Sequence, residues 1–260
     1  MLSVTYAQLN AWITAFLWPF ARIMALVATA PILGYATLPS TVKIGLAAFV
    51  TMIVAPTLTD LPTVTAFSAA GVWIMVNQVI IGVVLGLTMQ VVFAAVEMAG
   101  SFVGLQMGLG FATFFDPGSD ASSEVLSSFL NTVAMLAFLA FDGPAQVISA
   151  IAQSFQSTPV TAGLLGTPGL MTYLRWSSTI FSAGLLMSLP IVIAVLITNL
   201  LLGMLNRAAP QIGVFQIGFA TTLLVGMLLL QLMLPDLIPI FGQLFDMGID
   251  AMGRVAAGLR

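Results

Sequence analysis

The stretch GVWIMVNQVIIGVVLGLTMQVVFAAVEMAGSFVGLQMGLG, residues 71–110, holds a single charged side chain, Glu97. No charge interrupts the chain between Leu61 and Val96. A transmembrane helix needs about 20 apolar residues, so this stretch is long enough to span a bilayer. As one continuous helix it would be about 60 Å long, twice a hydrocarbon core of about 30 Å. Such a helix must tilt, break or leave the membrane.

The composition of the whole chain is that of a membrane protein. Its 260 residues are 60% hydrophobic and 6% charged, with a mean hydropathy of +1.14, whereas an average soluble domain is about a quarter charged. Apolar runs, read against the residues that break helices, give six candidate segments: 11–33, 42–58, 71–98, 125–141, 176–206 and 208–241. We therefore predict an all-α membrane protein, with long apolar helices that form one domain over residues 1–260.

The residue inventory excludes most enzyme classes. The chain has no cysteine and no histidine, which excludes thiolate redox chemistry, metal sites built from these residues and histidine-dependent triads. Lys43 is the only lysine and no phosphate-binding loop motif occurs, so we do not expect a nucleotide site. The cations are scattered and form no basic patch for nucleic acid. We predict a protein that is not an enzyme and that binds no cofactor, metal or nucleic acid.

The charges do not decide how the helices are oriented in the membrane. Alternating spans would place Lys43 and Arg207 on one side and Arg175, Arg254 and Arg260 on the other. Either the charges are too few, or some helices do not cross the bilayer conventionally, and the segment lengths favour the second explanation. The start of the chain lacks the basic residues of a cleavable signal peptide, so we expect the first helix to be retained.

Glycines recur at helical spacing in the quoted stretch. Two glycines four residues apart are followed 18 residues later by three more at the same spacing, and 18 residues are five full helical turns. The face consists of Gly82, Gly86, Gly100, Gly104 and Gly108. Such spacing lets helix backbones approach closely, so we predict that this face packs against another helix. Glycine is also frequent in membrane helices generally, and the spacing does not decide whether the neighbour belongs to this chain.

Two charged residues in apolar surroundings are candidate buried charges. Glu97 lies next to the glycine face, and an ionisable group there needs water or a partner. The alternative interpretation is that Glu97 marks the point where the helix reaches the membrane interface. Arg22, in the sequence WPFAR at residues 18–22, has the same ambiguity. For Arg22 the favoured interpretation is a side chain that snorkels to the interface.

The stretch LITNLLLGMLNRAAPQIGVFQIGF, residues 196–219, places polar side chains in an apolar helix. Asn199, Gly203 and Asn206 share one face, and Arg207 and Pro210 follow. Buried amides need hydrogen-bond partners, which helices supply to one another. Pro210 removes an amide donor and would kink or break the helix. This stretch would be a substrate site in a small transporter or a docking joint in an assembly subunit.

Three stretches carry a resemblance to a known family: WPFARIMALVATAPIL at 18–33, LGLTMQVVFAAVEMAGSFVGLQMGLGFATFFDPGS at 85–119 and LNRAAPQIGVFQIGF at 205–219. Over nearly its whole length the chain resembles the R-type subunits of the flagellar type III protein export gate. The resemblance implies a noncatalytic subunit in the bacterial inner (plasma) membrane, at the flagellar basal body. Helices of that family form tilted, broken hairpins in a hetero-oligomeric complex, much of which stands on the periplasmic side.

The resemblance also implies partners and a gating loop. The partners would be the P-type and Q-type gate subunits (FliP and FliQ), which complete a pore for unfolded flagellar proteins, and the B- and A-type export components. In that family the loop corresponding to 106–122 projects into the pore as a plug. The residues of this plug would be Gln106, Met107, Gly110, Phe111, Phe114, Phe115, Asp116 and Pro117.

A different class of function also fits the residues. A stand-alone secondary transporter of a small solute could use Glu97 and the face that carries Asn199 and Asn206. Many such transporters are built from internal repeats, and this sequence shows none. The export-gate subunit is therefore the preferred hypothesis.

Overall fold

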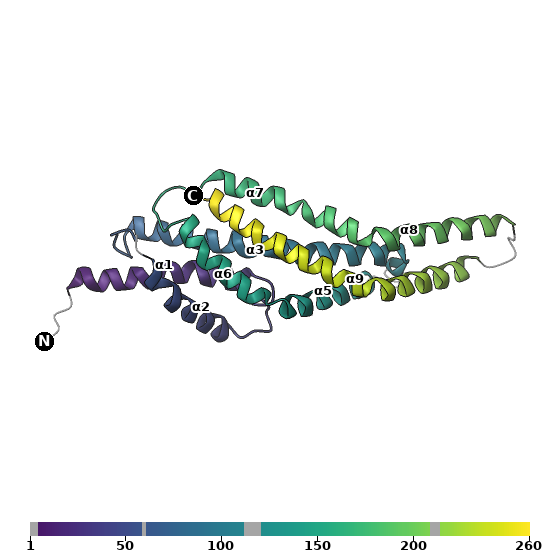
Figure 1. The fold of residues 1–260 in the computed structure, drawn as a ribbon, viewed down its shortest axis with the longest axis horizontal. Coiled ribbons are helices and arrows are strands. Elements are labelled where there is room, and N and C mark those ends of the chain that lie inside the picture. Colours follow the sequence, from purple (N-terminus) through teal and green to yellow (C-terminus); the bar gives the residue numbers. More distant parts are fainter. Residues whose placement is uncertain (1–4, 59–60, 112–120, 209–213) are drawn as a thin grey trace. The chain divides into compact units, whose positions relative to one another are not determined.

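The structure is a computed structural model that describes residues 5–58, 61–111, 121–208 and 214–260. Within these residues the regular structure is helical, with no strand (Figure 1). The elements are α1 (Tyr6–Thr29), α2 (Ser40–Val54), η1 (Ala55–Thr57), α3 (Ala69–Gln106), η2 (Leu109–Phe111), α5 (Ala121–Ala140), α6 (Gly143–Ser157), α7 (Thr167–Ser177), α8 (Thr179–Ala208) and α9 (Val214–Gly258).

The predicted fold class is confirmed. Five stretches in the described part of the chain are long and apolar enough to cross a membrane. They are Gln8–Thr29, Ser40–Thr57, Ala69–Gln106, Thr167–Ala208 and Gly218–Gly258. Helices α5 and α6 form a further pair, broken between Ala140 and Gly143, which raises the number to six if the pair is one span.

Several helix boundaries differ from the prediction. Helix α6 and helix α7 lie largely in a region that the apolar runs had assigned to loops, and α9 continues to Gly258 instead of ending at 241. Helix α6 was missed because Gln146, Gln153 and Gln156 interrupt its apolar residues. A helix with one polar face has a low average hydropathy, and a search for uninterrupted apolar runs overlooks it.

The end of α3 corrects the expected extent of the glycine face. The helix ends at Gln106, and Gly108 has a φ of 83°, in the left-handed region that glycine adopts without strain. The Gly108 amide donates to the carbonyl of Leu105 at 3.1 Å, and the Met107 amide donates to Val103 at 2.9 Å. Gly108 is therefore a helix-ending glycine and not a member of the packing face.

The chain forms two compact units. Unit 1 consists of Met1–Val91, Asp142–Ser177 and Phe245–Arg260, and unit 2 consists of Val92–Phe141 and Ser178–Leu244. Each unit has its own buried apolar side chains. The expectation of a single domain over 1–260 remains a prediction.

The core of unit 1 joins segments that are far apart in the sequence. Trp18 and Leu26 of α1, Ile81 of α3 and Ile151 of α6 are almost completely buried. The indole Nε1 of Trp176 in α7 donates to the carbonyl of Thr88 in α3 at 2.8 Å. The hydroxyl of Thr158, just after α6, donates to the carbonyl of Ala256 in α9. These two bonds fix α7 against α3 and the end of α6 against the last turns of α9.

The core of unit 2 lies between the second part of α3, α5, α8 and the first part of α9. The rings of Phe93 in α3 and Phe138 in α5 pack edge to face, with centroids 5.4 Å apart and planes at 86°. Leu130 of α5, Ile191 of α8 and Leu237 of α9 are buried in the same unit. The packing is mostly apolar, with a few buried hydroxyls such as those of Ser127, Ser188 and Thr222.

Candidate functional site

Two of the predicted glycines bring α3 against α1 in unit 1. A Cβ atom added to Gly82 would overlap the carbonyl oxygen of Arg22 and lie 2.8 Å from the Cβ of Ala25. A Cβ atom on Gly86 would overlap the hydroxyl of Thr29 and lie 3.1 Å from the amide nitrogen of Ala30. The neighbour of this part of the glycine face is therefore a helix of the same chain.

The next glycines lie in unit 2. A Cβ atom on Gly100 would lie 2.5 Å from the Cα and 2.8 Å from the amide nitrogen of Ser127 in α5. One residue further along α3, the hydroxyl of Ser101 lies 2.9 Å from that of Ser127. Gly104 is buried. The predicted face thus has different helices opposite it along its length, α1 in unit 1 and α5 in unit 2.

Arg22 lies at the centre of a buried polar cluster in unit 1, with none of its surface exposed. Its Nε donates to Gln78 Oε1 at 2.8 Å, one Nη to the carbonyl and hydroxyl oxygens of Ser154 at 3.1 Å, and the other Nη to the carbonyl of Thr158 at 2.9 Å. The guanidinium also stacks over the ring of Phe155, 4.1 Å from its centroid. Its partners within the described residues are all neutral.

The Arg22 cluster corrects the interpretation of this residue as a snorkelling arginine. Instead of reaching an interface, the guanidinium joins α1 to α3 and to the segment at the end of α6. Sequence reasoning missed Gln78, Ser154 and Thr158 as its partners. A signal was present for Gln78, because an amide in an uncharged apolar run needs a hydrogen-bond partner of its own.

The second candidate buried charge, Glu97, is exposed in this chain. Within this chain the side chain is therefore not a buried charge, and the alternative interpretation, a residue at the membrane interface, stays a prediction. Glu97 is on α3 in unit 2, beside the buried Val96 and one turn before the buried Gly100. Its side chain therefore lies on the surface at the edge of a packed helix face.

The polar face of α8 is exposed in unit 2. Asn199, Gly203, Asn206 and Arg207 all lie on the surface, and a Cβ atom on Gly203 would meet nothing within 4 Å. Neither asparagine amide bonds to another described residue, and Pro210 lies outside the described residues. Exposed apolar side chains surround this face, among them Leu196, Leu200, Leu201 and Met204.

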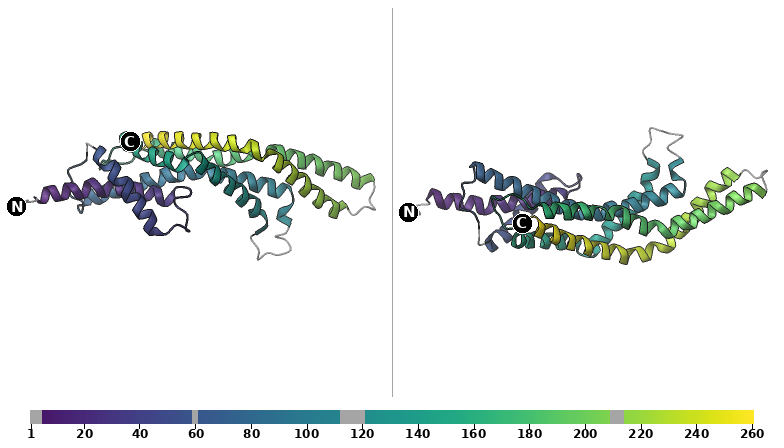
Figure 2. Two further views of the ribbon diagram at one scale, coloured as in Figure 1. Left: turned by 60° about the horizontal axis from the view of Figure 1, so that its bottom comes forward. Right: turned by 90° about the horizontal axis from the view of Figure 1, so that it is seen from above.

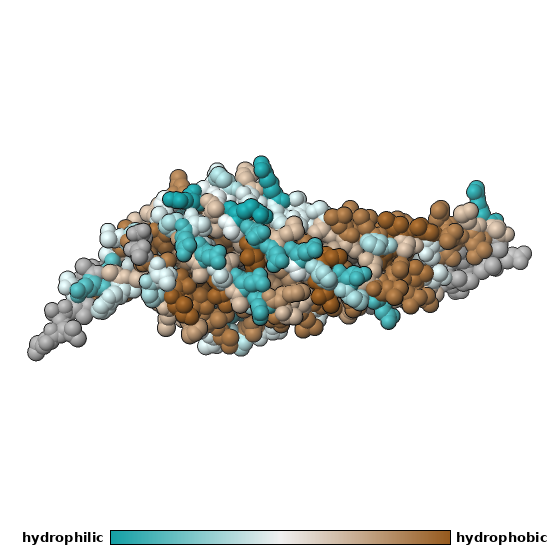
Figure 3. Space-filling view, viewed as in Figure 1, coloured by the Kyte–Doolittle hydropathy of each residue, from teal (hydrophilic) through white to brown (hydrophobic). Residues whose placement is uncertain are grey.

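Helices α8 and α9 lie side by side in unit 2 (Figure 2). A Cβ atom on Gly218 in α9 would lie 3.9 Å from the Cδ1 of Leu202 in α8, an ordinary side-chain contact between the two helices. The visible surface of this pair is mostly apolar (Figure 3). The exposed apolar side chains of α9 in this unit include Leu224, Leu228 and Leu232.

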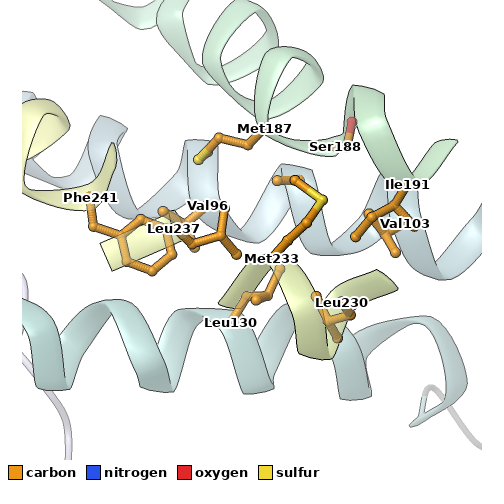
Figure 4. A pocket seen from close by; sticks show the side chains of 11 residues that line it. Val96, Val103, Leu130, Met187, Ser188, Ile191, Leu230, Met233, Leu237 and Phe241 are labelled. Carbon is orange, nitrogen blue, oxygen red and sulfur yellow. The ribbon is translucent and has the colours of Figure 1, made fainter. Parts of the chain in front are cut away.

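A small pocket in unit 2 is lined by side chains from α3, α5, α8 and α9 (Figure 4). Met187 and Met233 contribute thioethers, and Leu130, Leu237 and Phe241 contribute hydrocarbon surface. The one hydroxyl in the lining, that of Ser188, already donates to the carbonyl of Leu185 at 2.9 Å. The lining therefore offers nothing that would bind a small polar solute. No cluster of metal-binding side chains occurs among the described residues either.

The structure describes the first residues of the predicted plug, and they pack within unit 2. Gln106 is half-buried at the end of α3, and Met107 is fully buried. A Cβ atom on Gly226 of α9 would lie 2.5 Å from the Cγ of Met107, and the hydroxyl of Thr222 lies 3.3 Å from the Met107 carbonyl. The chain is thus held against α9 at this point.

The remaining plug residues are only partly described. Gly110 is half-buried and lies with Phe111 in the short helix η2. Phe114, Phe115, Asp116 and Pro117 lie outside the described residues. The described boundaries of the loop are α3 and α5, which pack against each other at Gly100 and Ser127.

The fold and these helix contacts define a class: a helical membrane protein whose polar groups mediate packing between helices. The family described as Bacterial export proteins, family 1, matches residues 13–248. The chain belongs to this family, and the resemblance predicted from its sequence is confirmed.

Similar proteins cover nearly the whole chain. Flagellar biosynthetic protein FliR of Pectobacterium carotovorum subsp. carotovorum is 43% identical over 99% of this chain and 100% of the relative. FliR of Escherichia coli strain K12 is 40% identical, over 98% of this chain and 99% of the relative. FliR of Bacillus subtilis strain 168 is 28% identical, over 94% and 95%. The likeness thus extends over both units.

Proposed function

We propose that the chain is a noncatalytic subunit of the flagellar type III export gate in the bacterial inner membrane. With P-type and Q-type subunits it would form the pore that passes unfolded flagellar proteins, in contact with the B- and A-type export components and with much of the complex on the periplasmic side. The full-length similarity to FliR supports the flagellar assignment. Its part in transport is to assemble and to change conformation, with no chemical step.

The observation that carries this proposal is the exposed amide face of α8. Only 17% of the most apolar part of the Gly218–Gly258 stretch is buried, and 28% of that of Thr167–Ala208. Lipid chains could cover the leucines of this surface, but they offer no partner for the amides of Asn199 and Asn206. A polar group on another protein helix would supply one. The α8 and α9 pair therefore has the chemistry of a subunit interface.

The transporter hypothesis has less support. Its candidate residues are on different helices, Glu97 on α3 and the two asparagines on α8, and none of them lines the pocket of unit 2. The pocket between α3, α5, α8 and α9 is apolar. A solute site in a transporter needs convergent polar groups.

The double variant Asn199→Leu and Asn206→Leu tests the α8 interface. We expect it to reduce the amount of chain that copurifies with a tagged P-type subunit by at least about tenfold, because hydrogen bonds between membrane helices contribute about 1–2 kcal/mol each in model peptides and about 1.4 kcal/mol is already a factor of ten. The isolated chain should stay folded, since both amides are exposed and have no described partners. Asn199→Gln with Asn206→Gln keeps the amides and should retain most of the yield. Equal copurified yields of the wild type, the leucine double variant and the glutamine double variant would show that α8 is not the interface.

We further propose that the segment 106–122 closes the pore as a plug. The support is its position between two packed helices and its anchor at Met107 on α9. An apolar segment can fill a narrow opening without the strong bonds that would hinder its release. The sequence GFATFF at 110–115 has this character.

Deletion of residues 110–119 tests the plug. We expect the shortened chain to assemble with its partners, because the anchor at Met107 and the contact at Gly100 remain. Membranes that contain the complex should then conduct ions or leak small solutes, measured as conductance in planar bilayers. Replacing the same residues by a glycine and serine segment of equal length should also leak. Unchanged conductance in both variants would contradict the plug.

A further inference from the structure

A polar groove runs between α6 and the last turns of α9 in unit 1. Its volume is about 750 Å³, and both walls come from within this unit. Helix α6 contributes Ser149, Gln153 and Gln156, and α9 contributes Asp250, Gly253 and Arg254. In a chain with 6% charged residues, this is a strong concentration of polar groups. Figure 3 shows polar side chains gathered over these helices.

We propose that this groove holds a membrane helix of a partner subunit, one that presents amide or hydroxyl side chains toward α6 and charges complementary to Asp250 and Arg254. The inference rests on the proposed assembly with partner subunits, but it concerns a different surface from the exposed face of α8. Three features of the groove support this occupant: its wall chemistry, its unpaired charges and its small residues.

The wall chemistry excludes lipid chains as the occupant. The amides of Gln153 and Gln156 and the hydroxyl of Ser149 are both donors and acceptors, and hydrocarbon satisfies neither. Gln153 donates to the hydroxyl of Ser149 at 3.2 Å, which leaves its carbonyl oxygen free for a further bond. A partner with amides or hydroxyls would satisfy these groups.

The charges of the groove add a requirement for the partner. Asp250 and Arg254 are four residues apart on α9 and both are exposed, yet they form no ion pair with each other or with another described residue. Opposite charges at this spacing can pair along a helix, so a partner side chain can still engage each one separately. A carboxylate opposite Arg254 and a basic group opposite Asp250 would give both charge and register complementarity.

The base of the groove leaves room for a helix backbone. A Cβ atom on Gly253 would meet nothing within 4 Å, and Ala257 follows four residues later. Small residues at four-residue spacing are the feature that lets membrane helices approach closely. The base is also firmly fixed, because Ser154 in its lining accepts a bond from the buried Arg22 and Thr158 bonds to Ala256. The shape of the groove is thus fixed within the chain before a partner binds.

Water is the competing occupant, and a cysteine introduced at the base distinguishes the two. The chain contains no cysteine, so Gly253→Cys gives one reactive thiol in space that is open within the chain. The probe is a charged, water-soluble maleimide, applied to the isolated chain in detergent and to the complex copurified with P-type and Q-type subunits. The matched control is Gly45→Cys, a second exposed helix position with nothing within 4 Å of its Cβ.

We expect the thiol at 253 to react at least about tenfold more slowly in the complex than in the isolated chain, because a docked helix must leave before the reagent enters. The thiol at position 45 should show a smaller difference in reaction rate between the isolated chain and the complex. Equal reaction at 253 in both preparations would overturn the proposal in favour of water. Copurification of the wild-type chain is measured first, so failure of the proposed assembly is recorded separately from failure of the groove.

A filling variant provides a second test. Gly253→Trp should leave the isolated chain folded, since the added ring enters open space, but it should reduce the copurified complex at least tenfold. Gly253→Ala should assemble like the wild type. If the tryptophan variant assembles normally, no helix occupies the groove. A photo-crosslinker at Ser149 should join the chain to a partner peptide from an apolar helix that carries amide or hydroxyl groups, and crosslinks to lipid alone would contradict the proposal.

Discussion

Gly82→Leu should prevent the chain from accumulating in its folded form. The backbone carbonyl of Arg22 lies where the first carbon of the side chain would stand, and Ala25 lies beside it. Neither is the end of a flexible side chain, so α1 and α3 would have to separate. Overpacking of a core usually costs about 1–3 kcal/mol, and we expect a value at or above the top of that range here. The measurement is the yield of monodisperse chain after detergent extraction.

Gly45→Leu is the matched control for this prediction. Gly45 is also a helical glycine, in α2, but it is exposed and its added side chain would meet nothing within 4 Å. Its yield should equal that of the wild type. Normal yield from Gly82→Leu would show that α1 and α3 do not pack through the glycine face.

Arg22→Met should destabilise the folded chain nearly as strongly. The methionine fills part of the space but leaves two buried acceptors without a donor, Gln78 Oε1 and the carbonyl of Thr158, whereas the Ser154 carbonyl keeps the amide of Thr158 as its donor. Each buried acceptor left unsatisfied costs about 1–3 kcal/mol, so the sum for the two is roughly 2 kcal/mol or more. The midpoint of denaturant unfolding in detergent would measure it.

Two further variants show whether the geometry of Arg22 matters. Arg22→Lys keeps the charge, but an ammonium on a flexible stem cannot reproduce the planar fork that bonds to three residues, Gln78, Ser154 and Thr158. We expect the unfolding midpoint of Arg22→Lys to lie between those of the wild type and the methionine variant. Arg207→Met, at an exposed position, should leave the unfolding midpoint unchanged. If Arg22→Met is as stable as the wild type, the cost of burying the cation offsets its hydrogen bonds.

The sequence predicts the long apolar helices and one packing face, because both depend on local periodicity. The spacing of Gly82, Gly86 and Gly100 indicates a close approach, and each of them does lie against another helix. Spacing alone does not tell which helix is opposite, and it does not reveal the positive φ that ends α3 at Gly108. The φ angle of Gly108 depends on where the helix ends. Glycine suits both a packing face inside a helix and the end of a helix, so the residue type does not distinguish them.

The Arg22 cluster shows why contacts between distant parts of the chain could not be predicted from the sequence. The acceptors on Ser154 and Thr158 lie 132 and 136 residues further along the chain. Two of the bonds go to backbone carbonyls, which every residue has and no residue type signals. Helix α6, which positions them, is itself hidden from a search for apolar runs because its polar face lowers the average. The polar groove was missed for the same reason.

Assembly is the central claim, and the mass of the intact complex tests it most directly. The chain would be expressed together with P-type and Q-type subunits, purified through a tag on the P-type subunit and measured by native mass spectrometry. We expect this chain in one defined hetero-oligomer with both partners, and a higher yield of the chain with them than without them. A stable, homogeneous monomer or homo-oligomer that ignores both partners would contradict the proposed function.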